Sequence, residues 1–354
     1  MSNEIGIHIG YNNRQWNHLF NDFPISPCKL SKGQGFFHYT SLSNALNILN
    51  FQSEKNEQAN NKSNFISLFA SHFLFLNDSA ELFDSLNSII ELLQEKCLSI
   101  NESNEKLKEA KILLNDYINR YQNIKPNQII NAPNHFIICF CLEGNLLSQW
   151  EYYGKECGIA IEFDLKNCLY DGLTNFKRGK PNMPLEIIPR KIIYTEKEKN
   201  NIINRLRNYN VTNVSDALIL ALHSISVASF MKHPCFSSER EVRLLFSPLF
   251  FTGHESISDA LKMIDYREAN GVIKPYMKIH IKHKSRNRVP IKSVTVGPGH
   301  NQKLVYNAII KLIQSKFESE SLVIPKSEIL KDQFLEVTKI GNVEVRRSTI
   351  PFRG

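Results

Sequence analysis

The sequence lacks the features of a membrane-spanning or secreted protein. No run among its 354 residues approaches the roughly 20 consecutive apolar residues that a transmembrane helix needs. The most apolar stretch, residues 214–231, contains Asp216, His223 and several serines, which indicates a buried helix instead. No basic segment followed by an apolar one opens the chain, so we expect no signal peptide and no membrane contact.

The cysteines and histidines exclude several stabilised or metal-dependent classes. The seven cysteines are odd in number and include no C-x-x-C pair, which argues against a disulfide framework and a zinc ribbon. The 11 histidines form no tight cluster, so we predict no metal site. These absences predict a reduced, cytoplasmic protein.

Several standard catalytic motifs are also missing. The chain contains no G-x-x-x-x-G-K-[ST], G-x-G-x-x-G, H-E-x-x-H or G-x-S-x-G sequence. Phosphate binding by a P-loop is therefore excluded. Hydrophobic residues make up 42% of the chain and charged residues 22%, which is ordinary for a globular protein and excludes wholesale disorder.

Positive charge is concentrated in one stretch of the sequence. Lys and Arg number 43 against 35 Asp and Glu, which gives a net charge of +8. Residues 274–292 contain no acidic residue and seven basic ones: Lys274, Lys278, Lys282, Lys284, Arg286, Arg288 and Lys292. This stretch indicates either a solvated basic face or a docking surface for RNA, DNA or an acidic protein.

The order of apolar patterns predicts an α+β fold. Residues 1–35 are polar and irregular and predict an N-terminal arm, while residues 36–354 predict a single catalytic-like domain. Short apolar runs predict strands, and helical periodicity predicts helices, including a helical insertion at about 79–123 interrupted near 101–104. Residues 52–64 have almost no apolar side chain and predict an exposed loop. The strands are expected at 35–39, 65–76, 136–141, 158–164, 192–194, 241–246, 277–281 and 293–296, and further helices at 196–208, 214–231 and 301–317.

Short polar and aromatic motifs occur at the ends of these apolar runs. They are His38-Tyr39-Thr40, Asn77-Asp78 with Glu81, Ser148-Gln149-Trp150 with Tyr152-Tyr153, Glu239-Arg240-Glu241 with Arg243, and Val296-Gly297-Pro298. In this order and spacing the sequence resembles the bacterial family called domain of unknown function 2971, from about residue 36 to 313. Trp150 is expected in the core, and Asn77 and Asp78 are equally well explained as an Asx turn that caps a helix.

A more distant resemblance gives the expected function. The strand ending in His38 with the following helix, and the later Glu-x-Glu, are similar to parts of the ADP-ribosyltransferases. That resemblance implies a split β-sandwich whose cleft holds NAD+ as substrate. It implies that His38, with Tyr39 and Thr40, binds a ribose hydroxyl, and that Tyr152 or Tyr153 stacks on nicotinamide with Ser148 nearby. Glu239 or Glu241 would then contact the nicotinamide ribose.

The glutamates make this chemistry reasonable. Two carboxylates at i and i+2 on a strand point to one face, and cleavage of the nicotinamide bond develops positive charge at the ribose. Arg243 would share that face, where it would hold either a pyrophosphate or the glutamates themselves in a salt bridge.

Three functions are therefore open on the sequence alone. The first is an ADP-ribosyltransferase or NAD+ glycohydrolase that acts as a toxin or antiphage effector, with an antitoxin or defence-system partner. The second is a non-catalytic module that senses a nucleotide or nucleic acid. The third is a metal-dependent nuclease that uses Asp78, Glu81 and Glu239.

Overall fold

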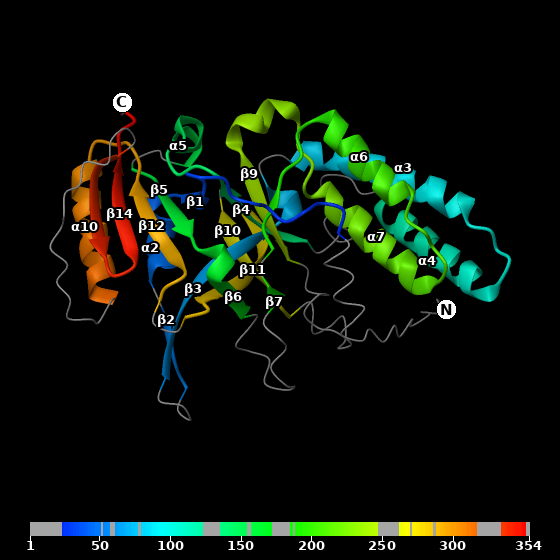
Figure 1. The fold of residues 1–354 in the computed structure, drawn as a ribbon, viewed down its shortest axis with the longest axis horizontal. Helices are drawn as coiled ribbons and strands as arrows, with labels where there is room; N and C mark the ends of the chain where they lie inside the picture. The colour runs from blue at the N-terminus through cyan, green and yellow to red at the C-terminus, as the bar shows by residue number, and fades with distance from the viewer. Residues whose placement is uncertain are drawn as a thin grey trace.

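The protein is an α+β molecule, as predicted, and it has a large open sheet with helices gathered at both ends (Figure 1). The computed structural model describes residues 23–50, 52–56, 61–76, 79–122, 135–153, 157–171, 185–186, 188–246, 262–269, 271–285, 288–316 and 334–351. None of the helices in these ranges is long and apolar enough to cross a membrane. The seven cysteines are all free thiols, as the sequence predicted.

One continuous sheet runs through the molecule. Its strand order is β13-β14-β12-β5-β1-β4-β3-β11-β6-β7; β2, β10 and β9 pair with strands of this path, and β8 pairs with β9. The paired strands are antiparallel except for β12 and β14, which are parallel. The bounds are β1 Phe36–Thr40, β2 Gln52–Asn56, β3 Asn61–His72, β4 Phe136–Cys141, β5 Ile159–Phe163, β6 Cys168–Asp171, β7 Leu185–Glu186, β8 Arg190–Lys191, β9 Glu241–Phe246, β10 Ile264–Ala269, β11 Val272–His283, β12 Ile291–Val296, β13 Phe334–Ile340 and β14 Val343–Ser348.

The sheet divides at β4. One edge of β4 pairs along its length with β9. The other edge pairs with two strands, because Cys141 lies opposite Phe37 of β1, while Ile137 lies opposite Ser71 of β3. Strands β1 and β3 therefore separate from each other as they leave β4, and a gap opens between them.

A helical unit covers one end of the molecule (Figure 1). It comprises α3 Ser79–Ser99, α4 Glu105–Tyr121, α6 Glu196–Arg207 and α7 Val214–Ala228. Helix α7 is apolar around most of its circumference, so it lies buried against α3 and α4. Asn104 caps α4 by accepting a hydrogen bond from the Leu107 amide, at the interruption that the sequence predicted. The helical part is thus larger than the predicted insertion, because residues 196–228 join it.

The other helices cover the sheet or connect its strands. Ser41 caps α2, since its hydroxyl accepts from the Asn44 amide at 3.4 Å. Helix α10 packs on β12, β13 and β14 and closes the core of that half. The bounds are α2 Leu42–Leu49, α5 Leu147–Tyr153 and α10 Gln302–Lys316, with short 3₁₀ turns η1 Phe73–Phe75, η3 Leu165–Asn167 and η4 Pro234–Glu239.

Two local predictions are wrong. Residues 52–64, expected as a loop, supply β2 and the start of β3, which pair as a hairpin. A hairpin that projects from the sheet forms through its backbone and needs no apolar alternation, so the pattern did not reveal it. The strand expected at 192–194 is instead β8 at Arg190–Lys191, followed by an isolated bridge from Ile193 to Met231.

The described part of the N-terminal arm attaches to the body of the protein. The Cys28 amide donates to the Pro189 carbonyl at 2.7 Å, and Pro27 forms a bridge with Arg190. The buried Arg190 guanidinium donates to the Ile25 carbonyl, and Arg205 donates to the Pro24 carbonyl at 2.6 Å. Residues 23–28 are thereby held against β8 and α6.

Candidate functional site

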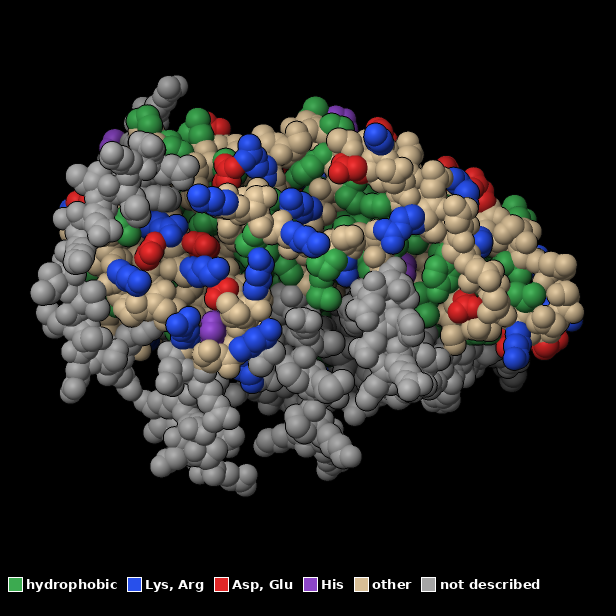
Figure 2. All heavy atoms as spheres, viewed as in Figure 1, with side chains coloured by type: hydrophobic (Ala, Val, Ile, Leu, Met, Phe, Trp, Pro, Cys, Tyr) green, Lys and Arg blue, Asp and Glu red, His purple; other side chains and the backbone are tan. Residues whose placement is uncertain are grey.

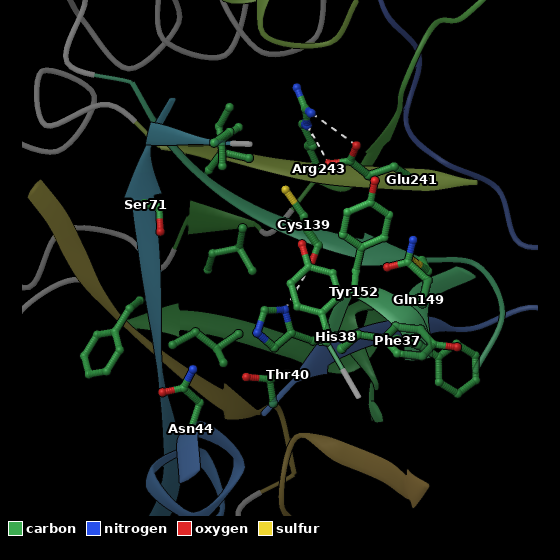
Figure 3. A pocket seen from close by; sticks show the side chains of 18 of the residues that line it. Phe37, His38, Thr40, Asn44, Ser71, Cys139, Gln149, Tyr152, Glu241 and Arg243 are labelled. Atoms are coloured by element: carbon green, nitrogen blue, oxygen red, sulfur yellow. Dashed lines mark hydrogen bonds and ion pairs between the residues drawn. The ribbon is translucent and has the colours of Figure 1, made fainter. Parts of the chain in front are cut away.

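A cavity of about 850 Å³ lies where β1 and β3 separate (Figure 3). Its walls come from β1, α2, β3, β4, α5, η4, β9 and β10. The structure brings most of the candidate residues to this one place: His38, Tyr39, Thr40, Tyr152, Tyr153, Glu239, Glu241 and Arg243 line it. Ser148, in the first turn of α5, is not among the described lining residues.

His38 lies at the floor of the cavity on β1. Its Nδ1 is 2.9 Å from the Cys139 carbonyl oxygen, and a carbonyl only accepts, so Nδ1 carries the proton. Burial lowers the pKa of His38, the bond to Cys139 opposes this, and the positive charge of Arg267 lowers it further. The imidazole is therefore neutral near pH 7 and presents Nε2 as a hydrogen-bond acceptor.

Tyr39 serves a structural purpose although it touches the cavity. Its hydroxyl donates to the Glu143 carbonyl and accepts from the Leu146 amide, both at 2.9 Å. Its ring packs against Trp150 with centroids 4.7 Å apart. Both hydrogen-bonding functions of the hydroxyl are used, so Tyr39 holds the segment before α5 in place, while the buried Thr40 beside it lines the cavity.

Tyr152 and Tyr153 lie on a helix, which no clear pattern in the sequence predicted. Both belong to α5, so they do not project to opposite faces, and both line the cavity. Tyr152 is 63% exposed and Tyr153 42%, which places them at the rim. Partial burial, together with the neighbouring Cys139 and Glu241, raises the pKa of Tyr153.

Trp150 is a core residue, as predicted. It is buried, and its Nε1 donates to Asn145 Oδ1 at 3.0 Å. A Cβ on Gly297 would lie 2.6 Å from the Trp150 ring, so the Val-Gly-Pro motif needs glycine for this close approach. Gln149, the middle residue of the Ser-Gln-Trp motif, is also buried and lines the cavity.

The two glutamates are arranged differently from the predicted pair on one strand. Glu239 is the last residue of η4, and Glu241 is the first residue of β9. Between them Arg240 adopts a left-handed conformation, with φ of 48°, which breaks the alternation. Lys232 joins the two carboxylates instead, because its Nζ lies 2.6 Å from Glu239 Oε2 and 3.4 Å from Glu241 Oε2.

Arg243 does share a face with Glu241, and it forms the salt bridge that the sequence left as one of two possibilities. Its Nε lies 2.7 Å from Oε1 and its Nη2 3.1 Å from Oε2 of Glu241, while Nη1 donates to the Ser229 carbonyl at 2.6 Å. Burial alone would raise the pKa of Glu241, but Arg243 and Lys232 outweigh it and hold the pKa below its usual range. All three guanidinium nitrogens therefore already have acceptors within the protein.

Lys232, Glu239, Glu241 and Arg243 form a cluster of two cations and two carboxylates, which we call the four-charge cluster. Its formal charge is zero. Sequence reasoning missed Lys232, although a lysine directly after the apolar residues 214–231 was a visible signal. A lysine that is 3% exposed must be paired, and here both glutamates pair with it.

The opposite wall of the cavity comes from β3 and β10. Phe69 and Ser71 of β3 and Arg267 of β10 line it, and Asn44 of α2 lies near its lower end. Sequence reasoning named none of these four residues. They lie in strands and a helix without any motif, and only the tertiary arrangement brings them to the cavity.

The acidic residues of the nuclease hypothesis are not assembled by the described parts of the chain. Asn77 and Asp78 lie outside the described residues, as does the side chain of Glu81, and Glu239 is bound by Lys232. Within the described ranges, no group of three or more His, Cys, Asp or Glu side chains is placed to hold a metal ion.

The predicted basic stretch follows β11 and the segment after it. Lys274, Lys278 and Lys282 recur every fourth residue along β11 and therefore share one face of the strand. Lys284, Arg288 and Lys292 follow β11. Arg286 lies outside the described residues. Figure 2 shows Lys and Arg side chains spread over the sheet half of the molecule, with acidic side chains among them. Within the stretch, Lys292 pairs with Asp164 at 3.3 Å.

The fold and the cavity define an α+β protein with a ligand-sized cleft at a division in its sheet. Residues 149–244 match the family model described as "Protein of unknown function (DUF2971)", which confirms the resemblance over that segment. The matched residues run from α5 to β9 and include both rim tyrosines and the whole four-charge cluster. No curated protein and no solved structure matches the chain.

Proposed function

We propose that the protein binds NAD+ in this cleft and cleaves its nicotinamide–ribose bond, with transfer of ADP-ribose to a macromolecule or to water. One observation carries the proposal: His38, the rim tyrosines and Glu239 face a single cavity at the point where β1 and β3 separate. A sheet divided in this way supports the resemblance to the split β-sandwich of ADP-ribosyltransferases. Ligand sites commonly have volumes of roughly 300–1,000 Å³, so the cavity has room for a nucleotide.

Each residue of the cleft has a separate role in the proposed cleavage of NAD+. The C1′–N bond breaks with its electron pair going to the nicotinamide nitrogen, and an acceptor oxygen bonds to C1′ and loses its proton. Glu239 is the carboxylate that stabilises the positive charge on the ribose, because Arg243 already holds both oxygens of Glu241. Glu241 helps to position Lys232, and Lys232 in turn orients Glu239. His38 Nε2 accepts from a ribose hydroxyl, and Tyr152 or Tyr153 stacks on nicotinamide.

The basic strand next to the cleft suggests a polyanionic acceptor. Lys278 of β11 lies opposite Phe69 of β3, and Phe69 lines the cavity. RNA, DNA or an acidic protein bound along Lys274, Lys278 and Lys282 would pass beside the cleft. An enzyme of this kind would act in the cytoplasm as a toxin or antiphage effector, restrained by an antitoxin or other defence partner, and this assignment rests on analogy.

A second candidate function is nucleotide sensing without catalysis. The observation that favours it is the neutral four-charge cluster, in which every carboxylate already has a cationic partner. In that case the cleft binds a nucleotide, and the glutamates only stabilise the fold.

Nicotinamide release distinguishes the two functions. The purified protein is incubated with NAD+, free nicotinamide is measured by chromatography, and binding is measured separately by calorimetry. Glu239→Gln and His38→Ala should each lower the release rate by about 10²-fold or more. The exposed residues Glu105 and His300 supply matched controls, Glu105→Gln and His300→Ala, which should leave it unchanged.

Two outcomes would contradict the proposed cleavage of NAD+ in the cleft. NAD+ binding without nicotinamide release, in the wild type as in the variants, would establish the sensing function instead. Release that survives both Glu239→Gln and His38→Ala would show that the cleft is not the site of cleavage.

A further inference from the structure

Among the described residues, three cationic side chains line the cleft, and two of them are already neutralised. Lys232 is held by Glu239 and Glu241, and Arg243 is held by Glu241 and the Ser229 carbonyl. Arg267 differs, because it belongs to none of the ion pairs among the described residues. Its positive charge is therefore available to an anionic ligand.

The position of Arg267 is fixed by its neighbours. On β10 it lies opposite Lys274 of β11, and its side chain reaches across β11 to β3. There Nη2 donates to Ser71 Oγ at 3.2 Å, while the guanidinium carbon lies 5.5 Å from the ring centroid of Phe69 and 5.7 Å from that of Tyr276. The two rings contact each other edge to face at 4.8 Å. A guanidinium held by two rings and a hydroxyl is pre-organised, so little conformational entropy is lost when it binds.

One hydrogen-bond donor of Arg267 is unsatisfied. Its Nε is buried and has no hydrogen-bond partner in the part of the chain that the structure describes. An unpaired buried donor is costly, and a ligand oxygen that accepts from it would remove that cost. The charge acts across the cleft, since it contributes, after burial, to the lowered pKa of His38.

We propose that Arg267 and Ser71 bind a phosphate group of the ligand on the β3 side of the cleft. The planar guanidinium offers parallel donors that match two oxygens of a phosphate, and the Ser71 hydroxyl can donate to a third. In Figure 3 Ser71 lies on one wall, Gln149 and Tyr152 lie on the other, and His38 lies between them. This inference deepens the proposed function and rests on it for the identity of the ligand as a nucleotide: the diphosphate lies near Arg267, and the nicotinamide ribose near Glu239.

Binding of ADP, inorganic pyrophosphate and adenosine, measured by calorimetry, tests the proposal without requiring any reaction. Arg267→Gln should weaken ADP and pyrophosphate by about 10- to 100-fold, as expected for loss of charge-assisted hydrogen bonds. Arg267→Lys keeps the charge without the planar donors and should fall in between, and Ser71→Ala should give a smaller loss. Adenosine, which has no phosphate, should bind equally to all of these variants.

Arg288→Gln is the matched control, because it removes one positive charge from an exposed position in the basic stretch 274–292. It should leave ADP binding unchanged. Equal weakening by Arg288→Gln and Arg267→Gln would show that only net charge matters and would overturn the inference. Failure of ADP and pyrophosphate to bind the wild type would also overturn it.

The two proposals fail in different ways. If ADP binding depends on Arg267 but NAD+ releases no nicotinamide, the phosphate site stands and the cleavage reaction does not. If nicotinamide is released and Arg267→Gln leaves KM for NAD+ unchanged, the reaction stands and the phosphate site does not.

Discussion

At the scale of single residues, the buried charges of the four-charge cluster dominate the behaviour of the site. Glu241 is 6% exposed and carries two cationic partners that are as deeply buried as itself. Charges in such a place are expensive to leave unpaired, so the cluster stabilises the protein only as a complete set.

Glu241→Gln should lower the free energy of unfolding by about 3–5 kcal/mol, because the buried Arg243 would lose its carboxylate and Lys232 would lose one of its two. Urea denaturation near pH 7 measures this, and Glu105→Gln, on an exposed surface pair, should change the free energy little. The pKa of Glu241 is held below its usual value of 4.5, so its stabilisation is complete above that pH and is lost as the pH falls through the lower, folded value. The difference between the wild type and Glu241→Gln should therefore narrow in acid; a constant difference down to pH 3 would contradict the ion-pair explanation.

His135 makes the stability of the protein depend on pH for a reason unrelated to the four-charge cluster. It is buried beside Phe73, and its Nδ1 has no hydrogen-bond partner among the described residues. Burial together with His72 lowers the pKa of His135 to about 3. Since the unfolded value is near 6.5, His135 must lose its proton to fold, and stability falls as the pH drops below 6.5.

His135→Leu should remove this dependence, which amounts to about 1.4 kcal/mol per pH unit. The measurement is a series of urea titrations between about pH 7 and pH 4, with His300→Leu at an exposed position as the control. Parallel pH profiles for His135→Leu and the wild type would show that His135 does not titrate on unfolding.

At the scale of elements, the join between η4 and β9 determines the geometry of the cleft. Arg240 at this join has a left-handed backbone, and its side chain pairs at the surface with Glu143. The left-handed turn separates Glu239 from Glu241 and allows Lys232 to lie between their carboxylates.

Substitutions at Arg240 should follow backbone preference more than charge. Arg240→Gly should be at least as stable as the wild type, whereas Arg240→Val should be less stable by about 1–2 kcal/mol, because a β-branched residue disfavours positive φ. Thermal unfolding compares them with Arg288→Val, at an exposed arginine outside the left-handed region. A greater loss in Arg240→Gly than in Arg240→Val would show that the ion pair, and not the backbone, matters.

Several elements show which features the sequence could predict and which it could not. Helices with clear apolar stripes and caps, such as α6 and α7, were predicted within a few residues, because their periodicity is local. The Glu-x-Glu pair was predicted on one strand because nothing local reveals that Arg240 takes positive φ. Helix α5 at 147–153 was not among the predicted helices, because seven residues are too few to show a helical period. Arg267 was missed because its role depends on Ser71, a residue 196 positions away in the sequence.

At the scale of the whole molecule, the helical unit is built from two distant parts of the chain. Leu114 of α4 is fully buried in the same apolar cluster as Leu220 and Ala221 of α7. Helices α3 and α4 are therefore not an independent insertion, since α7 depends on them for its apolar environment.

Leu114→Ala should lower the free energy of unfolding by about 2–5 kcal/mol through the cavity that it leaves. Hydrogen exchange should show that amides of α6 and α7 lose protection together with those of α3 and α4. Leu98→Ala, at a leucine that is 81% exposed, serves as the control and should change neither measurement. Loss of protection confined to α3 and α4 would contradict a single cooperative unit.

The pairing of β4 with both β1 and β3 has a consequence for selectivity. The separation of β1 and β3 is set by the main-chain pairing of each strand with β4. Rotamer changes of side chains at the rim can alter which groups contact a ligand. They do not change the distance between the two strands. Accommodation of a bulkier molecule would require β1 or β3 to detach from β4, at a cost of about 1 kcal/mol for each main-chain bond released. The strand pairing thus limits the size of the ligand, while the side chains determine which chemical groups it can have.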